Sequence, residues 1–358
     1  MRYQLICLKS VPSQVVTIPV KNNQLYGYKS HKNCTNNYYK CKFLELFYIV
    51  KCSPLDKRRE ITHKRISGAS LLQIRKGCGW RNPDGLGFHI TGAADDGQAK
   101  FGEFPWTVAI FKIEPLNNKS NSEKLNVYVG SGSLIHPSVV LTAAHHVSSS
   151  QFRVRAGEWD TQTTNELYPH QDRDVKEVIV HKDFNKGNLF YDIALLFLTS
   201  PVDLAPNVGV ACLPNAGAGA RAAAGTRCLA SGWGKDFGKG TYRPVMKRAE
   251  VPVVDRARCQ QELRKTRLGD IFELHSSFMC AGGEAGADTC RISPRMSCSS
   301  RYLLTLLDRY IQHGIVAWGI GCDEQTPAAY VDVGHLRAWI DDKVRGHGYD
   351  QTVYTYLD

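Results

Sequence analysis

The sequence predicts an all-β domain from residue 101 onward. Two observations support this prediction: short apolar runs recur along the chain, and turn-forming residues separate them, as is typical of a sandwich or a barrel. The runs lie at residues 107–113, 125–129, 139–141, 152–156, 175–181, 193–198, 227–231, 247–253, 315–318 and 329–333. Helical spacing of apolar residues is confined to residues 256–267 and 336–344.

The charge of the chain is concentrated at its start. The chain has 358 residues, enough for one large β domain with an appendage, and a formal net charge of +11. Residues 1–77 hold 15 Lys and Arg against 3 Asp and Glu, so this leader carries +12 and the remainder about −1. This distribution argues against a nucleic-acid groove in the β domain. The leader could touch acidic surfaces, although a solvated basic tail is the simpler interpretation.

The twelve cysteines predict a secreted, extracellular protein, because cytosolic chains rarely hold paired structural cysteines. No signal peptide is visible, since Lys9, Pro12, Ser13 and Gln14 interrupt the first twenty residues. No apolar stretch is long enough to span a bilayer. We therefore infer secretion from the cysteines alone and expect no membrane span.

Two residues have the chemistry of a proton-transfer pair. His145 follows an apolar run in the segment LTAAHHV, and Asp192 begins the apolar run DIALLF. A histidine can accept and return a hydroxyl proton when a buried carboxylate fixes its tautomer. A carboxylate in an apolar run needs such a partner, because an unpaired buried charge is costly.

Five blocks in order resemble the trypsin/chymotrypsin family of serine proteases: GEFPW at 102–106, TAAH at 142–145, DIALL at 192–196, CLASGWG at 228–234 and GIVAWG at 314–319. The segment CGWRNPDG at 78–85 narrows the resemblance to the arthropod clip-domain serine protease homologues. Those homologues, which include relatives of the prophenoloxidase-activating factors, keep the fold and have lost the nucleophile.

The resemblance implies two antiparallel six-stranded β-barrels with a cleft between them and a C-terminal helix on the second barrel. The ranges that follow are an irregular basic leader at 1–77, a linker at 78–100, a trypsin-like domain at 101–346 and a tail at 347–358. The leader lacks the six-cysteine pattern of a clip domain, and the pairing of Cys7, Cys34, Cys41 and Cys52 is left open.

In family terms His145 is the general base and Asp192 its orienting carboxylate. Alignment from Cys290 puts Pro294, which has no hydroxyl, at the nucleophile position. Ile292 replaces a glycine of the oxyanion loop, and Ser293 replaces the aspartate that pairs with the new N-terminus after activation. The resemblance therefore implies that this chain is not a working peptidase.

The two residues at the positions of one family disulfide also differ from the family. His146 and Gly130 stand where the family has two bonded cysteines, and we expect His146 to be a surface histidine beside the cleft. A metal site at His145 and His146 would need a third ligand that the sequence does not offer. No cofactor and no metal are expected.

The specificity pocket is implied at four positions. Asp288 stands at the base where trypsin-like members hold a carboxylate, and Ala317, Gly319 and Ala328 stand on the walls. Ala328 replaces a glycine, so its methyl group should narrow a slot meant for Arg or Lys.

The resemblance also implies four disulfides: Cys78–Cys212, Cys228–Cys298, Cys259–Cys280 and Cys290–Cys322. The pair Cys228–Cys298 is the least secure, because the family's cysteine lies ten positions beyond Cys290 and Cys298 lies only eight beyond it. A disulfide tolerates only a narrow separation of its Cα atoms.

The expected function is that of a non-catalytic homologue in an extracellular arthropod immune cascade that leads to melanisation. Its implied partners are clip-domain proteases, prophenoloxidase or microbial surfaces. The alternative is an active trypsin-like endopeptidase whose coding sequence is misread after Cys290, since residues 291–309 resemble nothing in the family. A damaged product that folds poorly is the third interpretation.

Overall fold

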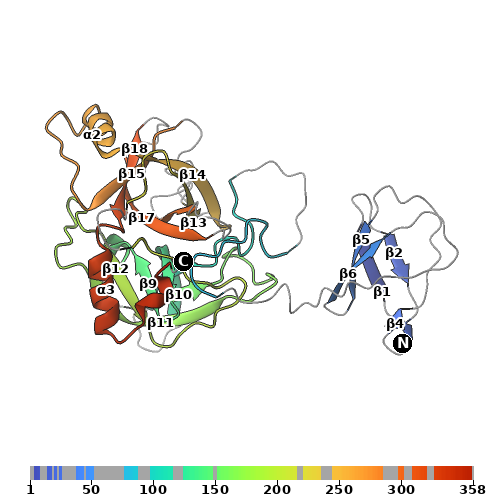
Figure 1. Cartoon of the computed structure of the whole chain (residues 1–358). Coiled ribbons are helices and arrows are strands. Elements are labelled where there is room, and N and C mark those ends of the chain that lie inside the picture. The colour runs from blue at the N-terminus through green and yellow to red at the C-terminus, as the bar shows by residue number, and fades with distance from the viewer. Residues whose placement is uncertain are drawn as a thin grey trace. The chain divides into compact units, whose positions relative to one another are not determined.

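The computed structural model divides the chain into two compact units, Met1–Ile74 and Arg75–Asp358. In the first unit it describes the backbone of six strands. In the second it describes residues 76–87, 97–115, 124–147, 151–215, 221–234, 244–284, 309–320 and 326–356, together with the backbone of residues 297–301. Figure 1 shows the elements and their labels.

The leader contains regular strands and is not irregular as predicted. Antiparallel strands form a sheet in the order β2-β1-β5-β6, and β3 pairs with β4. Their bounds are β1 Gln4–Leu8, β2 Gln14–Thr17, β3 Val20–Lys21, β4 Gln24–Leu25, β5 Tyr38–Phe43 and β6 Leu46–Lys51. Aromatic and β-branched residues in these segments favour extended backbone. The register places Cys7 directly opposite Cys41.

The first barrel closes in the order β10-β11-β12-β9-β8-β7, with every pair antiparallel. Its strands are β7 Thr107–Pro115, β8 Lys124–His136, β9 Val139–Thr142, β10 Phe152–Ala156, β11 Gln171–Val180 and β12 Ala194–Leu198. The sequence FRVRA of β10 shows why it is a strand: alternate residues are buried, and Arg153 and Arg155 between them pair with Asp174 and Asp172 of β11 at 2.8 and 2.7 Å.

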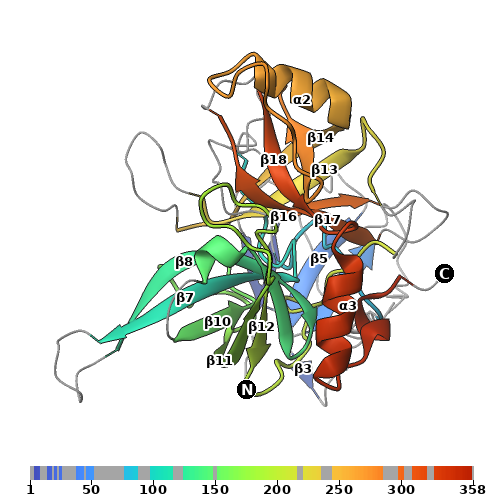
Figure 2. The ribbon, with the colours of Figure 1, turned by 90° about the vertical axis from the view of Figure 1, so that its left-hand side faces the viewer.

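The second barrel closes in the order β13-β14-β15-β18-β17-β16. Its strands are β13 Arg227–Gly232, β14 Lys247–Val254, β15 Phe278–Gly282, β16 Ser297–Arg301, β17 Tyr310–Trp318 and β18 Pro327–Asp332. The two barrels confirm the fold class that the resemblance implied. In the views of Figures 1 and 2, β13 to β18 gather above β7 to β12.

The described part of the larger unit contains the α-helices α2 (Arg256–Arg264) and α3 (Arg337–Gly346). The Asp255 side chain caps α2 by accepting from two backbone N–H groups. Helix α3 buries Ile340 and Val344 in a core that also contains Leu195 of the first barrel and Ile315 of the second. The C-terminal helix therefore packs on both barrels and not on the second alone. Among the described residues, no helix combines the length and apolar character needed to cross a membrane.

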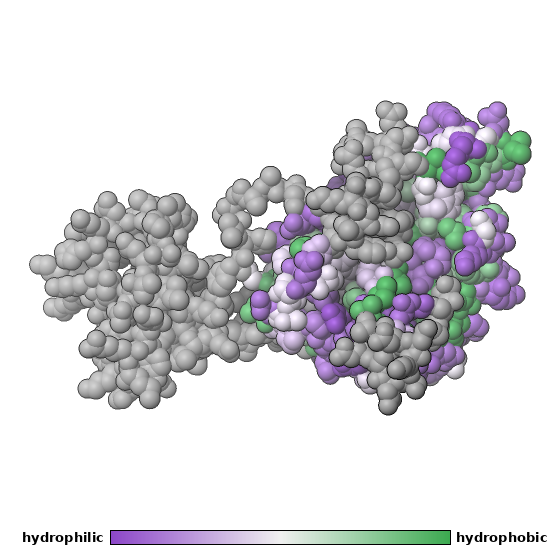
Figure 3. Space-filling view, turned by 180° about the vertical axis from the view of Figure 1, so that it is seen from behind, coloured by the Kyte–Doolittle hydropathy of each residue, from purple (hydrophilic) through white to green (hydrophobic). Residues whose placement is uncertain are grey.

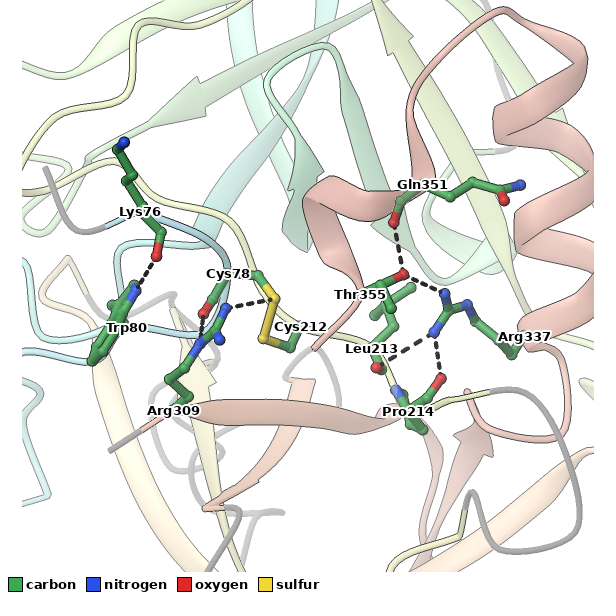
Figure 4. The surroundings of a disulfide bond; sticks show 10 residues. All are labelled: Lys76, Cys78, Trp80, Cys212, Leu213, Pro214, Arg309, Arg337, Gln351 and Thr355. Atoms are coloured by element: carbon green, nitrogen blue, oxygen red, sulfur yellow. Dashed lines mark hydrogen bonds between the residues drawn. A yellow bond between two sulfur atoms is a disulfide. The ribbon is translucent and has the colours of Figure 1, made fainter. Parts of the chain in front are cut away.

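Residues 76–87 are fixed to the rest of the larger unit. Figure 4 shows Cys78 bonded to Cys212, which lies in the connection between the barrels. The buried Arg309 donates from Nε to the carbonyl oxygen of Cys78 at 2.8 Å. Its guanidinium also lies over the rings of Trp80 and Tyr356, at 5.5 and 4.8 Å. The Arg309 side chain therefore contacts both the segment before the barrels and the residues that follow α3.

Candidate functional site

The proposed proton-transfer pair is assembled by two neighbouring strands. His145 lies in the 3-10 turn Ala144–His146 that follows β9, and Asp192 lies just before β12. Strands β9 and β12 are paired, with Thr142 opposite Ala194, so the two side chains meet at one end of the ladder. The sequence predicted this neighbourhood only through the family resemblance.

The contacts of the Asp192 carboxylate come from His145. The backbone N–H of His145 donates to Oδ1 at 2.8 Å, and Nδ1 lies 2.5 Å from Oδ2. Asp192 is fully buried, whereas about a quarter of the His145 side chain is exposed. With the proton on Nδ1, both carboxylate oxygens have a donor and Nε2 is left as an acceptor. This is the arrangement that a general base requires.

The loop before Asp192 has a strained backbone. Leu189 and Tyr191 have φ angles of 59° and 52°, a left-handed region that residues with side chains seldom adopt. The second barrel supports this loop, since Tyr191 N–H donates to the buried Ser277 Oγ at 3.2 Å. The ring of His275, two residues before Ser277, stacks on Phe190 at 3.9 Å. Such strain persists only where the surrounding structure holds it.

The three residues predicted as walls of the specificity pocket lie on β17, on β18 and directly after β17. Ala317 is buried at a β-bulge, because the register of β17 against β18 shifts between Val316 and Trp318. A Cβ atom on Gly319 would lie 3.7 Å from the Cβ of Ala328, at ordinary van der Waals contact. The Ala328 methyl therefore faces the backbone of Gly319.

A profile of the trypsin family matches residues 96–340. The chain belongs to the trypsin family. Among curated proteins it is 66% identical to phenoloxidase-activating factor 2 of Galleria mellonella over 290 residues, which cover 79% of this chain and 93% of that protein.

More distant relatives carry the word inactive in their names. The inactive CLIP domain-containing serine protease A8 of Anopheles gambiae is 37% identical over 76% of this chain and 73% of its own length. The inactive CLIP domain-containing serine protease A3 of Aedes aegypti is 41% identical over 69% of this chain and 50% of its own length.

Part of the trypsin-family site lies outside the described residues. This holds for Asp288, Cys290, Ile292, Ser293, Pro294 and Cys322. The identities of these residues are set by the sequence, and their roles stay predictions.

Two disulfides occur in the described part of this trypsin-family chain, and both are among the implied pairs. Cys78 is bonded to Cys212 with a Cα separation of 4.9 Å, and Cys259 to Cys280 with 6.3 Å. The second bond ties the helix α2 to β15.

Cys228 departs from the family pairing, because it is a free and buried thiol. The register of β13 against β16 gives the reason: Ser300 lies opposite Cys228, and Cys298 lies opposite Ala230. Diagonal neighbours two positions along a strand have Cα atoms about 7–8 Å apart, beyond the roughly 7 Å that a disulfide can span. Cys298 lies two positions too close to Cys290 in the sequence, and in the barrel it lies two positions away from the residue that faces Cys228.

Three features of this trypsin-like unit were missed from the sequence: the burial of His146, the contact of Ser277 with the Asp192 loop, and Arg309. His146 is 6% exposed and not a surface residue. Gly130 was the available signal, because a glycine opposite the histidine leaves space for its ring. Arg309 ends the stretch that resembles nothing in the family, so no signal pointed to it.

Proposed function

We propose that this chain is a non-catalytic member of the trypsin family that acts as a regulatory or binding protein in an extracellular arthropod cascade. The observation that carries the proposal is Pro294 at the nucleophile position. It is supported by the relatives whose names call them inactive and by a phenoloxidase-activating factor at 66% identity. The cysteines and the paired disulfides support secretion.

The chemistry of the pair explains why activity is not expected. His145 and Asp192 can hold and polarise a water molecule, but without a hydroxyl they have no covalent acyl-transfer route. Removing one oxyanion donor costs about 100- to 1,000-fold in rate, and Ile292 stands where the family has a glycine of the oxyanion loop. Loss of the nucleophile adds a larger factor.

The partners that we propose are clip-domain proteases, prophenoloxidase or microbial surfaces. A protease surface without turnover can still dock the substrates and enzymes that the family recognises. Reconstitution tests this: purified prophenoloxidase and an activating clip-domain protease are mixed with and without this protein. We expect phenoloxidase activity to rise when the protein is added. The absence of any rise, together with no binding to either component or to microbial cell walls, would contradict the proposal.

An active trypsin-like endopeptidase is the second candidate, and the geometry of His145 and Asp192 favours it. It requires a different coding sequence between residues 291 and 309. Transcript reads across this segment decide between the candidates: reads that encode Pro294 support the non-catalytic form, and reads that encode a family nucleophile loop support the enzyme.

A further inference from the structure

The ring of His146 occupies the space that a side chain at position 130 would need. Gly130 lies in β8, and His146 ends the turn that carries His145. A Cβ atom on Gly130 would lie 2.5 Å from Nδ1 of His146 and 2.7 Å from Cγ and Cε1. Real Cβ atoms essentially never approach a neighbour closer than 3.0 Å. Any side chain at position 130 would therefore have to displace the imidazole ring.

The ring of His146 is held from several sides. It is 6% exposed, and its Nδ1 lies 3.4 Å from Oγ1 of the buried Thr142, whose hydroxyl donates to the Ser131 carbonyl oxygen at 2.9 Å. The His146 ring also meets the ring of His145 edge to face, with 4.1 Å between the ring centroids. The imidazole is thus enclosed by β8, by β9 and by His145.

We propose that His146 is a positioning residue for His145. Asp192 fixes the Nδ1 edge of the His145 ring through its hydrogen bond, and the His146 ring lies against it as a second support. The family resemblance implies a disulfide at positions 130 and 146, which would link β8 to the turn that carries His145. In this chain the His146 ring takes the place of that disulfide, and Gly130 leaves the space for the ring. This role is independent of whether the chain cleaves peptides.

The described residues add no further candidate metal ligands to the two histidines. Nδ1 of His145 is engaged by Asp192 at 2.5 Å. Within the described ranges, no group of three or more His, Cys, Asp or Glu side chains could hold a metal ion.

The first test is a double-mutant cycle on the full chain. Gly130→Ala places a methyl group on the ring, and its backbone conformation allows a side chain because φ is not in the left-handed region. We expect Gly130→Ala to lower the melting temperature by several degrees in the wild type, and to have little effect or raise it in the His146→Ala background. Equal losses of melting temperature in the wild type and in the His146→Ala background would contradict the proposed contact between position 130 and the His146 ring. Rescue by the double variant remains measurable even where Gly130→Ala alone does not fold.

The second test reads the position of His145 directly. The Nδ1 proton shared with Asp192 should give a low-field proton NMR signal that depends on the geometry of that hydrogen bond. His146→Ala should shift or broaden it. The matched control is His313→Ala, which removes another buried histidine, in β17; it should lower stability and leave the signal in place. An unchanged signal in His146→Ala would show that His146 only packs in the core and does not position His145.

A cross-linked variant completes the test. A Cβ on Gly130 would lie 2.7 Å from Cγ of His146, one carbon–carbon bond from the His146 Cβ. The two Cβ positions are therefore no farther apart than the roughly 3.5–4.5 Å that a disulfide spans. Gly130→Cys with His146→Cys should form this bond and return the low-field signal, which His146→Ala shifts or broadens, to its wild-type position and width. A bond that forms without restoring the signal would contradict the positioning role.

Discussion

At the scale of single residues, the retained pair has a structural role whatever the fate of catalysis. Asp192 is fully buried, and its hydrogen bonds come from His145. Removing one partner of such a pair leaves a buried charge with too few donors, which costs more than an exposed pair would. Even without a nucleophile, the chain would therefore need His145 in order to fold well.

We predict that His145→Ala lowers the free energy of unfolding by about 2–4 kcal/mol, since a buried charged group loses its side-chain donor. Chemical denaturation of the wild type and the variant measures the difference. Asp174→Ala removes the exposed partner of Arg153 and serves as the control, with an expected change below about 1 kcal/mol. A His145→Ala variant as stable as the wild type would refute the structural role.

The response to acid also belongs to single residues. Burial lowers the pKa of His136, of His181 and of His275 below the ordinary histidine value, and for His136 the Asp350 carboxylate opposes this only in part. The unfolded chain then takes up protons at a higher pH than the folded chain. Stability should fall as the pH drops below about 6.5. Melting temperatures between pH 8 and pH 5 test this, and His181→Gln should flatten the decline; a melting temperature that rises toward pH 5 would contradict it.

At the scale of elements, the sequence predicted most strands of the barrels and missed two. β15 has the sequence FMCAG and β16 has SCSSR, and neither contains β-branched residues. β16 is a strand because β13 and β17 pair with it on both sides, so the barrel imposes what the local sequence does not favour. The pairing of His145 with Asp192 followed from the family resemblance. The burial of His146 was missed, although Gly130 gave a signal for it, because the space that this glycine leaves exists only across the folded sheet.

The register of β16 gives a prediction at this scale. Ser300 lies opposite Cys228, where the family has a cysteine. We predict that Ser300→Cys, in a Cys298→Ser background, forms a bond to Cys228. The closed loop is long, so the chain-entropy model allows about 4 kcal/mol of stabilisation before strain. Peptide mapping without reductant and the melting temperature measure it, with Cys298→Ser alone as the control. A free Cys228 in the double variant would show that the register differs.

At the scale of the whole molecule, the larger unit is held together around the connection between its barrels. Cys212 and Leu213 lie there, Arg309 reaches the Cys78 carbonyl, and Arg337 of α3 donates to Thr355 of the C-terminal residues. Figure 3 shows hydrophilic and hydrophobic residues interspersed over the described part of the surface seen from behind. The described residues of the expected linker (78–100) and of the expected tail (347–358) thus pack against the rest of the larger unit.

Proteolysis tests this arrangement. The bond Cys78–Cys212 joins residues 134 positions apart, a separation that corresponds to about 4–5 kcal/mol in the chain-entropy model. We predict that a cut between Cys78 and Phe101 leaves the two parts attached until reductant is added. Limited trypsin digestion followed by mapping should recover Cys78 and Cys212 as one linked peptide. Recovery of both as separate alkylated peptides without reductant would contradict this.

The central claim is that this member of the trypsin family has no working nucleophile. The most direct measurement is the intact mass of the purified protein after incubation with a phosphonate probe that modifies activated serines, with trypsin treated in parallel. We predict that trypsin gains one adduct and that this protein gains none, because Pro294 stands at the nucleophile position. One adduct per chain, lost in His145→Ala, would contradict the account.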